Sequence, residues 1–126
     1  MERFYMSSNH FTDKELACHH CGKEGIQPEF LAVLEAIRED VGFAMPITSG
    51  YRCDNHPIED HKATNHGAHT QGRAVDVAVA REQAYLVIRS AVGHGVTGIG
   101  IEQKGDHHFL HLDMALGLPR PTVWSY

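Results

Sequence analysis

The chain is short of the features that mark several classes of protein. It contains three cysteines and one tryptophan, and only 8% of its residues are aromatic. No apolar run reaches the length of about 18 residues that a transmembrane helix needs, so no membrane insertion is expected. The opening residues, MERFY, lack the apolar centre and cleavage site of a signal peptide. We therefore expect the protein to be cytoplasmic when it is synthesised.

Positive charge is also scarce. Lysine and arginine together number 11 against 16 acidic residues, which gives a formal net charge of −5. Nucleic-acid binding needs clustered Lys and Arg, so nucleic acid is excluded as the expected partner. A length of 126 residues with 42% hydrophobic content fits one globular domain, residues 1–126, with a modest core. We expect it to be a monomer.

Histidine, by contrast, is abundant, with 11 in the chain. The segment HTQGRAVD, from His69 to Asp76, places two metal-binding side chain types on either side of Gly72. Valines alternate with small or polar residues over 74–79, a period of two that indicates a strand and puts Asp76 on its small-residue face. The glycine predicts a tight turn that folds His69 back over that face.

A third metal ligand is expected from the strand predicted over 107–113. Alternation puts His111 and Asp113 on one face of this strand and two leucines on the other. If the strand lies antiparallel to that of Asp76, the side chains of His69, Asp76 and His111 converge. Two histidines and a carboxylate with an open position are typical of catalytic zinc.

An arginine lies near this predicted centre. A short strand over 46–48 leads into Ser-Gly-Tyr-Arg, and the glycine should break the strand and leave Arg52 at its end. An arginine in a cleft binds a carboxylate through two parallel hydrogen bonds. The alternative is that Arg52 forms an ordinary surface ion pair.

The cysteines suggest a second, separate site. Cys18-His-His-Cys21-Gly is a turn that can present two thiolates to one metal ion, and Cys53 adds a third thiol. A fourth ligand would be one of three histidines, His19, His20 or His56. The alternatives are reduced, packed thiols, or one pair that forms a disulfide after release from the cell.

The remaining pattern predicts an α+β fold. Thr12 and Glu15 form a capping-box pattern, which indicates that a short helix begins there. Periodicity and turn residues predict helices over 28–41 and 82–92, a polar loop over 53–68, a strand over 98–101 and a turn over 103–106.

These motifs resemble a known family. The Ser-Gly-Tyr-Arg segment, the His-x6-Asp spacing and the Phe-Leu-His-Leu-Asp strand are similar, in order and spacing, to the D-Ala-D-Ala carboxypeptidase and phage endolysin family of zinc peptidases. That family is related to lysostaphin-type enzymes and to the hedgehog domain. The resemblance covers about residues 10–126, and the tail, 120–126, is similar to endings of small phage-borne members.

The resemblance implies a site and a reaction. It implies Zn²⁺ held by His69, Asp76 and His111, with Arg52 contacting the substrate. It implies a small antiparallel sheet with helices packed on it, as in hedgehog and D-Ala-D-Ala peptidase domains. The implied activity is hydrolysis of peptidoglycan stem peptides at a D-Ala-D-Ala or an L-Ala-D-Glu bond, in phage or prophage lysis. Such an enzyme acts on the cell wall once it is released.

Two positions differ from the family pattern. Gly67 stands where many members have a substrate-binding serine, and His108 stands where they have a carboxylate base. We expect His108 to be the base, because a neutral imidazole accepts protons near neutral pH, with Asp106 as second candidate. Asp113 is expected to orient His111 rather than to act as the base.

Two other functions remain open from the sequence. The first is a binding module like the zinc-containing hedgehog domain, which keeps the metal ligands but does not catalyse. The second is a zinc-knuckle protein built on Cys18 and Cys21, which the acidic net charge disfavours as a nucleic-acid binder.

Overall fold

The computed structural model describes residues 10–53 and 67–126. Its elements, in chain order, are α2 (Asp13–Leu16), α3 (Pro28–Val41), β1 (Ile47–Ser49), β2 (Ala74–Val77), α5 (Arg81–Gly93), β3 (Gly98–Glu102), β4 (Phe109–Asp113) and β5 (Thr122–Ser125). Within these described ranges, no helix combines the length and the apolar character needed to cross a membrane.

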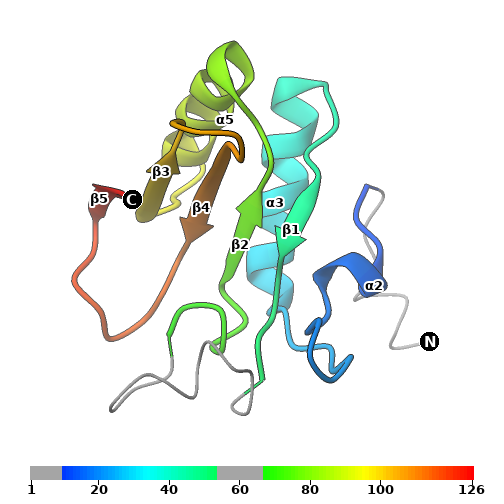
Figure 1. Cartoon of the computed structure of the whole chain (residues 1–126). Helices are drawn as coiled ribbons and strands as arrows, with labels where there is room; N and C mark the ends of the chain where they lie inside the picture. The colour runs from blue at the N-terminus through cyan, green and yellow to red at the C-terminus, as the bar shows by residue number, and fades with distance from the viewer. Residues whose placement is uncertain (1–9, 54–66) are drawn as a thin grey trace.

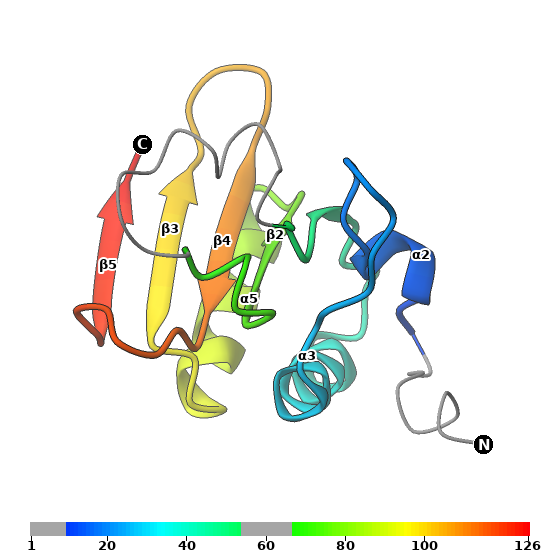
Figure 2. The ribbon, with the colours of Figure 1, turned by 90° about the horizontal axis from the view of Figure 1, so that it is seen from below.

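The strands form one five-stranded mixed sheet in the order β1-β2-β4-β3-β5. Neighbouring strands from β1 to β3 are antiparallel, whereas β5 runs parallel to β3. Helices α3 and α5 pack side by side against the sheet, and α2 lies beyond β1 (Figures 1 and 2). The α+β class is confirmed, but the sheet is not wholly antiparallel because of β5.

The two faces of β2 and β4 have different surroundings. Val75 pairs with Leu112 and Val77 with Leu110, and all four side chains are completely buried in the core beneath the helices. Because side chains alternate along a strand, the residues between them point to the other face. Asp76, paired directly with His111, is therefore on the face that the helices leave uncovered.

The helix boundaries follow local signals. Pro28 occupies the first turn of α3, and Gly42 ends the helix in the left-handed conformation, with φ of 76°. At α2, the Thr12 side chain accepts a hydrogen bond from the Glu15 backbone and the Glu15 carboxylate accepts one in return. The helices predicted over 28–41 and 82–92 and the capping box are confirmed.

Strand β5 was not predicted from the sequence. It packs beside β3, where Gly100 is opposite Trp124 in the register. A Cβ at Gly100 would lie 2.6 Å from the indole nitrogen of Trp124, too close for a side chain. The glycine therefore leaves space for the indole, whose ring lies 5.1 Å from that of His111.

Candidate metal centre

His69, Asp76 and His111 meet on the uncovered face of the sheet. Asp76 Oδ1 lies 3.4 Å from His69 Nε2 and 3.2 Å from His111 Nδ1. One nitrogen or oxygen atom from each residue lies within 4.8 Å of the others. Three ligand atoms at such separations can contact one ion at bonding distance.

A tight turn brings His69 to this position. Gly72 has φ of 76°, and a Cβ there would lie 1.9 Å from the carbonyl oxygen of Gly25, so only glycine fits. The buried ring of His69 then places Nδ1 2.8 Å from the carbonyl oxygen of Gly50. A carbonyl only accepts, so Nδ1–H donates to it and the Nε2 lone pair faces Asp76.

The carboxylate of Asp113 orients the ring of His111, as the Gly50 carbonyl orients that of His69. Its Nε2 lies 2.5 Å from Asp113 Oδ2, so Nε2–H donates to Asp113 and the Nδ1 lone pair faces Asp76. Asp113 is fully buried and also accepts hydrogen bonds from the guanidinium of Arg120, at 2.8 and 2.7 Å, and from the Ala115 backbone. Each histidine thus presents a lone pair toward the same point, as metal-binding histidines do.

The electrostatics of the centre favour a cation. Burial raises the pKa of Asp76, but the adjacent side chains of His111 and His69 outweigh this effect and hold that pKa well below its usual range. Burial lowers the pKa of His111, but Asp113 and Asp76 outweigh it and raise that pKa. Both shifts show that the carboxylates attract positive charge at this point, which a metal ion also supplies.

Arg52 lies at the edge of the centre. Its Nη2 is 3.5 Å from Asp76 Oδ2, and its Nε donates to Ser49 Oγ at 3.2 Å. Its backbone N–H donates to the carbonyl of His69 at 3.3 Å, and its side chain is 13% exposed. The guanidinium is therefore held beside the candidate ligands rather than on the open surface.

A comparison with protein families agrees with this arrangement. The family model described as Peptidase M15 matches residues 9–113, which include all three candidate ligands and Arg52. The chain belongs to the peptidase M15 family. No curated protein matches the chain.

The ligand chemistry fits the metal that the M15 family implies. Two neutral imidazole nitrogens and one carboxylate oxygen are a donor set that catalytic zinc accepts, with one position left for water or substrate. The hydrogen bonds to Gly50 and Asp113 select the histidine tautomers that such binding requires. These three residues of the M15 chain could therefore hold a zinc ion.

The C-terminal tail adds residues that the sequence interpretation missed. The Trp124 ring lies 5.1 Å from that of His111, and the Arg120 guanidinium lies 5.2 Å from the same indole. Tyr126 packs against Phe109, and burial raises the pKa of its hydroxyl. Residues 122–125 include β-branched and aromatic residues of the kind enriched in strands, a signal that the sequence analysis did not use, and no local signal identifies β3 as the partner strand.

The structure does not bring the predicted base to the centre. His108 lines a surface hollow with residues of α5, on the helix side of the sheet, and Asp106 is exposed in the turn between β3 and β4. The residues lining this hollow with His108 are Arg81, Ala84, Tyr85, Ile88 and Gln103. The histidines predicted in the loop, including His56 and His66, lie outside the described residues.

The three cysteines form a second group. One sulfur from each of Cys18, Cys21 and Cys53 lies within 4.8 Å of the others. The structure therefore brings together thiols from two distant segments, as the metal hypothesis for this motif expects.

Proposed function

We propose that the protein is a zinc-dependent peptidase that hydrolyses an amide bond in bacterial peptidoglycan stem peptides, at a D-Ala-D-Ala or an L-Ala-D-Glu bond. The observation that carries the proposal is the convergence of His69, Asp76 and His111 within 4.8 Å. Both histidines have their other ring nitrogen engaged by a hydrogen-bond acceptor, so their lone pairs are aimed in advance. Membership of the peptidase M15 family supports the same activity.

The zinc ion and the side chains have separate roles in the proposed reaction. Zinc, when bound, supplies a Lewis acid that activates water and polarises the scissile carbonyl. Asp76 remains anionic across the physiological range because its pKa is held low. Asp113 keeps the His111 ring in one tautomer and one orientation.

Arg52 is the proposed substrate anchor. Its guanidinium is a planar donor that binds carboxylates through two hydrogen bonds. Each of the two proposed scissile bonds lies next to a carboxylate. In D-Ala-D-Ala it is the carboxylate of the terminal D-Ala, and in L-Ala-D-Glu it is a carboxylate of the D-Glu residue. The position of Arg52 beside Asp76 puts this donor within reach of a substrate whose scissile bond lies at the centre.

The proposed proton acceptor is His108, with Asp106 as second candidate. In the structure His108 faces α5, so this role requires the segment before β4 to move toward His111 when substrate binds. A general base has to reach within hydrogen-bond distance of the proton that it removes.

One observation favours a second function. Among residues 10–53 and 67–126, the metal-binding group at Asp76 consists of His69, Asp76 and His111, and His108 faces α5 instead of this group. A non-catalytic zinc-containing binding domain of the hedgehog type would have this composition. It would bind cell-wall peptides without cutting them.

The experiment is digestion of purified peptidoglycan and of a defined muropeptide, followed by mass spectrometry. Loss of the terminal D-Ala identifies a carboxypeptidase, and separation of L-Ala from D-Glu identifies an endopeptidase. Asp76→Ala serves as the inactive control. Intact muropeptide after incubation with the zinc-loaded protein would contradict peptidase activity, and retention of the protein on the insoluble wall would then support the binding domain. A role in phage or prophage lysis predicts that expression in the periplasm lyses the host.

A further inference from the structure

The cysteine group lies outside the centre described above. Cys18 and Cys21 belong to the turn that follows α2. Cys53 is adjacent to Arg52, in the segment that leads away from β1. The described residues include all three cysteines, and none of them is in a disulfide. Two segments far apart in the sequence therefore present three thiols to one point.

The turn that carries the first two thiols is tightly closed. The Gly22 backbone N–H donates to the Cys18 carbonyl at 2.7 Å, and the Cys18 N–H donates to the Lys23 carbonyl at 2.9 Å. Gly22 has φ of 79°, a conformation that favours glycine. This closure turns the side chains of Cys18 and Cys21 toward the same side.

Backbone N–H groups surround the buried sulfur of Cys18. The Cys53 N–H donates to it at 3.4 Å, and the N–H groups of Cys21 and His20 also donate. N–H groups directed at a sulfur stabilise the thiolate, which is the form that binds metals.

A histidine lies beside the group. His20 Nδ1 lies 3.7 Å from Cys53 Sγ, whereas its neighbour His19 lines a surface hollow that Cys18 and residues of α2 also line. We propose that Cys18, Cys21, Cys53 and His20 bind a second zinc ion. Three thiolates and one imidazole fill all four tetrahedral positions, so the site is structural and leaves no position for substrate.

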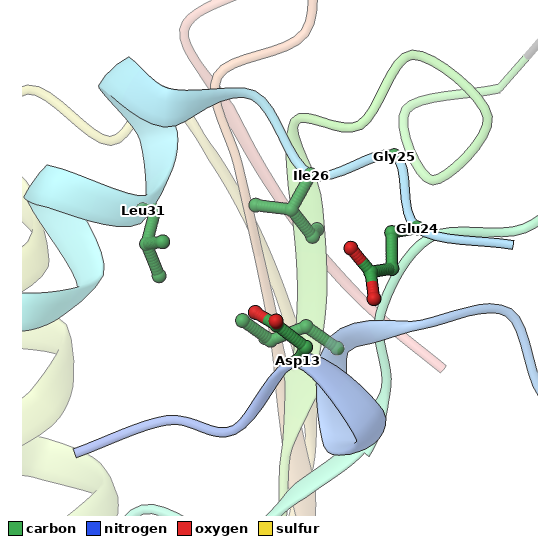
Figure 3. Close-up of a pocket in the computed structure, with 6 residues that line it drawn as sticks. Asp13, Glu24, Gly25, Ile26 and Leu31 are labelled. Atoms are coloured by element: carbon green, nitrogen blue, oxygen red, sulfur yellow. The ribbon is translucent and has the colours of Figure 1, made fainter. Parts of the chain in front are cut away.

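The expected effect of this ion is to fasten the N-terminal segment to the sheet. Helix α2 has only four residues, and a pocket remains between it and α3 (Figure 3). The residues lining this pocket are Asp13, Leu16, Glu24, Gly25, Ile26 and Leu31. Apolar packing is therefore incomplete there, and a cross-link adds stability that the small interface lacks.

The same cross-link would hold Arg52 in place. On the N-terminal side of Arg52, the Tyr51 N–H donates to the Leu16 carbonyl at 2.9 Å. A Cβ on Gly50 would lie 2.4 Å from that carbonyl oxygen, so the two backbones are in close contact. On the other side is Cys53. The backbone that carries Arg52 is thus fixed against the N-terminal segment at both ends.

Metal analysis of the purified protein by mass spectrometry tests the site without any substrate. We expect about two zinc ions per chain in the wild type and about one in the Cys21→Ser variant. Cys21 is chosen because its side chain is exposed and serine is of similar size. His20→Ala should lose the second ion to a chelator more readily than the wild type. The adjacent variant His19→Ala is the matched control and should behave as the wild type.

Cobalt substitution separates the two centres. A thiolate-to-cobalt charge-transfer band should appear in the wild type, persist in His111→Ala and disappear in Cys21→Ser. Zinc lost from His111→Ala but retained in Cys21→Ser would overturn this inference and leave the proposed function intact. Zinc lost only from Cys21→Ser would support it while the proposed function fails. A disulfide between any two of the cysteines in protein kept under reducing conditions would also overturn it.

Discussion

His111 and Asp113, two residues apart on β4, are joined by a hydrogen bond of 2.5 Å between Nε2 and Oδ2. Strand alternation puts both side chains on the same face, and Arg120 from the tail binds both oxygens of the carboxylate. Asp113 therefore fixes the His111 imidazole through Nε2, and Nδ1 of the ring is directed at Asp76.

Weakening this support should weaken metal binding. Asp113→Asn keeps the shape but removes the charge that attracts the Nε2 proton, so we expect zinc affinity to fall by about 10- to 100-fold. Competition with a chromogenic chelator measures the change. Asp106→Asn, the same substitution at an exposed position, is the control for affinity. An unchanged affinity in Asp113→Asn would show that Arg120 and packing alone orient the ring.

Loss of a ligand should remove the ion from the His-Asp-His centre. We expect His69→Ala, Asp76→Ala and His111→Ala each to lose about one zinc per chain together with peptidase activity. Metal analysis and circular dichroism on the same samples separate metal loss from unfolding. Folded His111→Ala protein with undiminished zinc would refute the assignment.

Arg52→Lys should reduce activity without changing zinc content. Lysine keeps the positive charge but has no planar pair of donors, so the contact with the substrate carboxylate is weakened. We expect kcat/KM to fall by about 10-fold or more, a cost of at least about 1.4 kcal/mol. Unchanged kinetics would mean that Arg52 only neutralises Asp76.

His108→Ala tests the proposed base. If His108 accepts the proton, the variant should keep its zinc and lose about 10² to 10⁴ in turnover, and His108→Glu should restore part of it. Full activity in His108→Ala with an inactive Asp106→Asn protein would transfer the role to Asp106. Wild-type rates in both variants would show that the ring of His108 stays beside α5 during the reaction.

Local pattern determined the two longer helices, the strands that carry Asp76 and His111, and the identity of the candidate ligands, but not strand β5. The helix over 28–41 carries its own start and stop in Pro28 and Gly42, and each signal acts through the conformation of a single residue. The period-two alternation around Asp76 and around His111 placed each residue on the face of its own strand opposite the large apolar side chains, and the structure then showed that the two strands pair.

Tertiary structure decided the surroundings of those ligands. The parallel pairing of β5 with β3 brings Arg120 to Asp113 and Trp124 to His111, and Gly50, the residue after β1, brings its carbonyl to His69. These contacts join different elements of the fold across loops and turns, so no local period specifies them. Strand pairing depends on the side chains of two strands at once. For β3 and β5 it also depends on the space that Gly100 leaves, and this space is apparent only in the folded sheet.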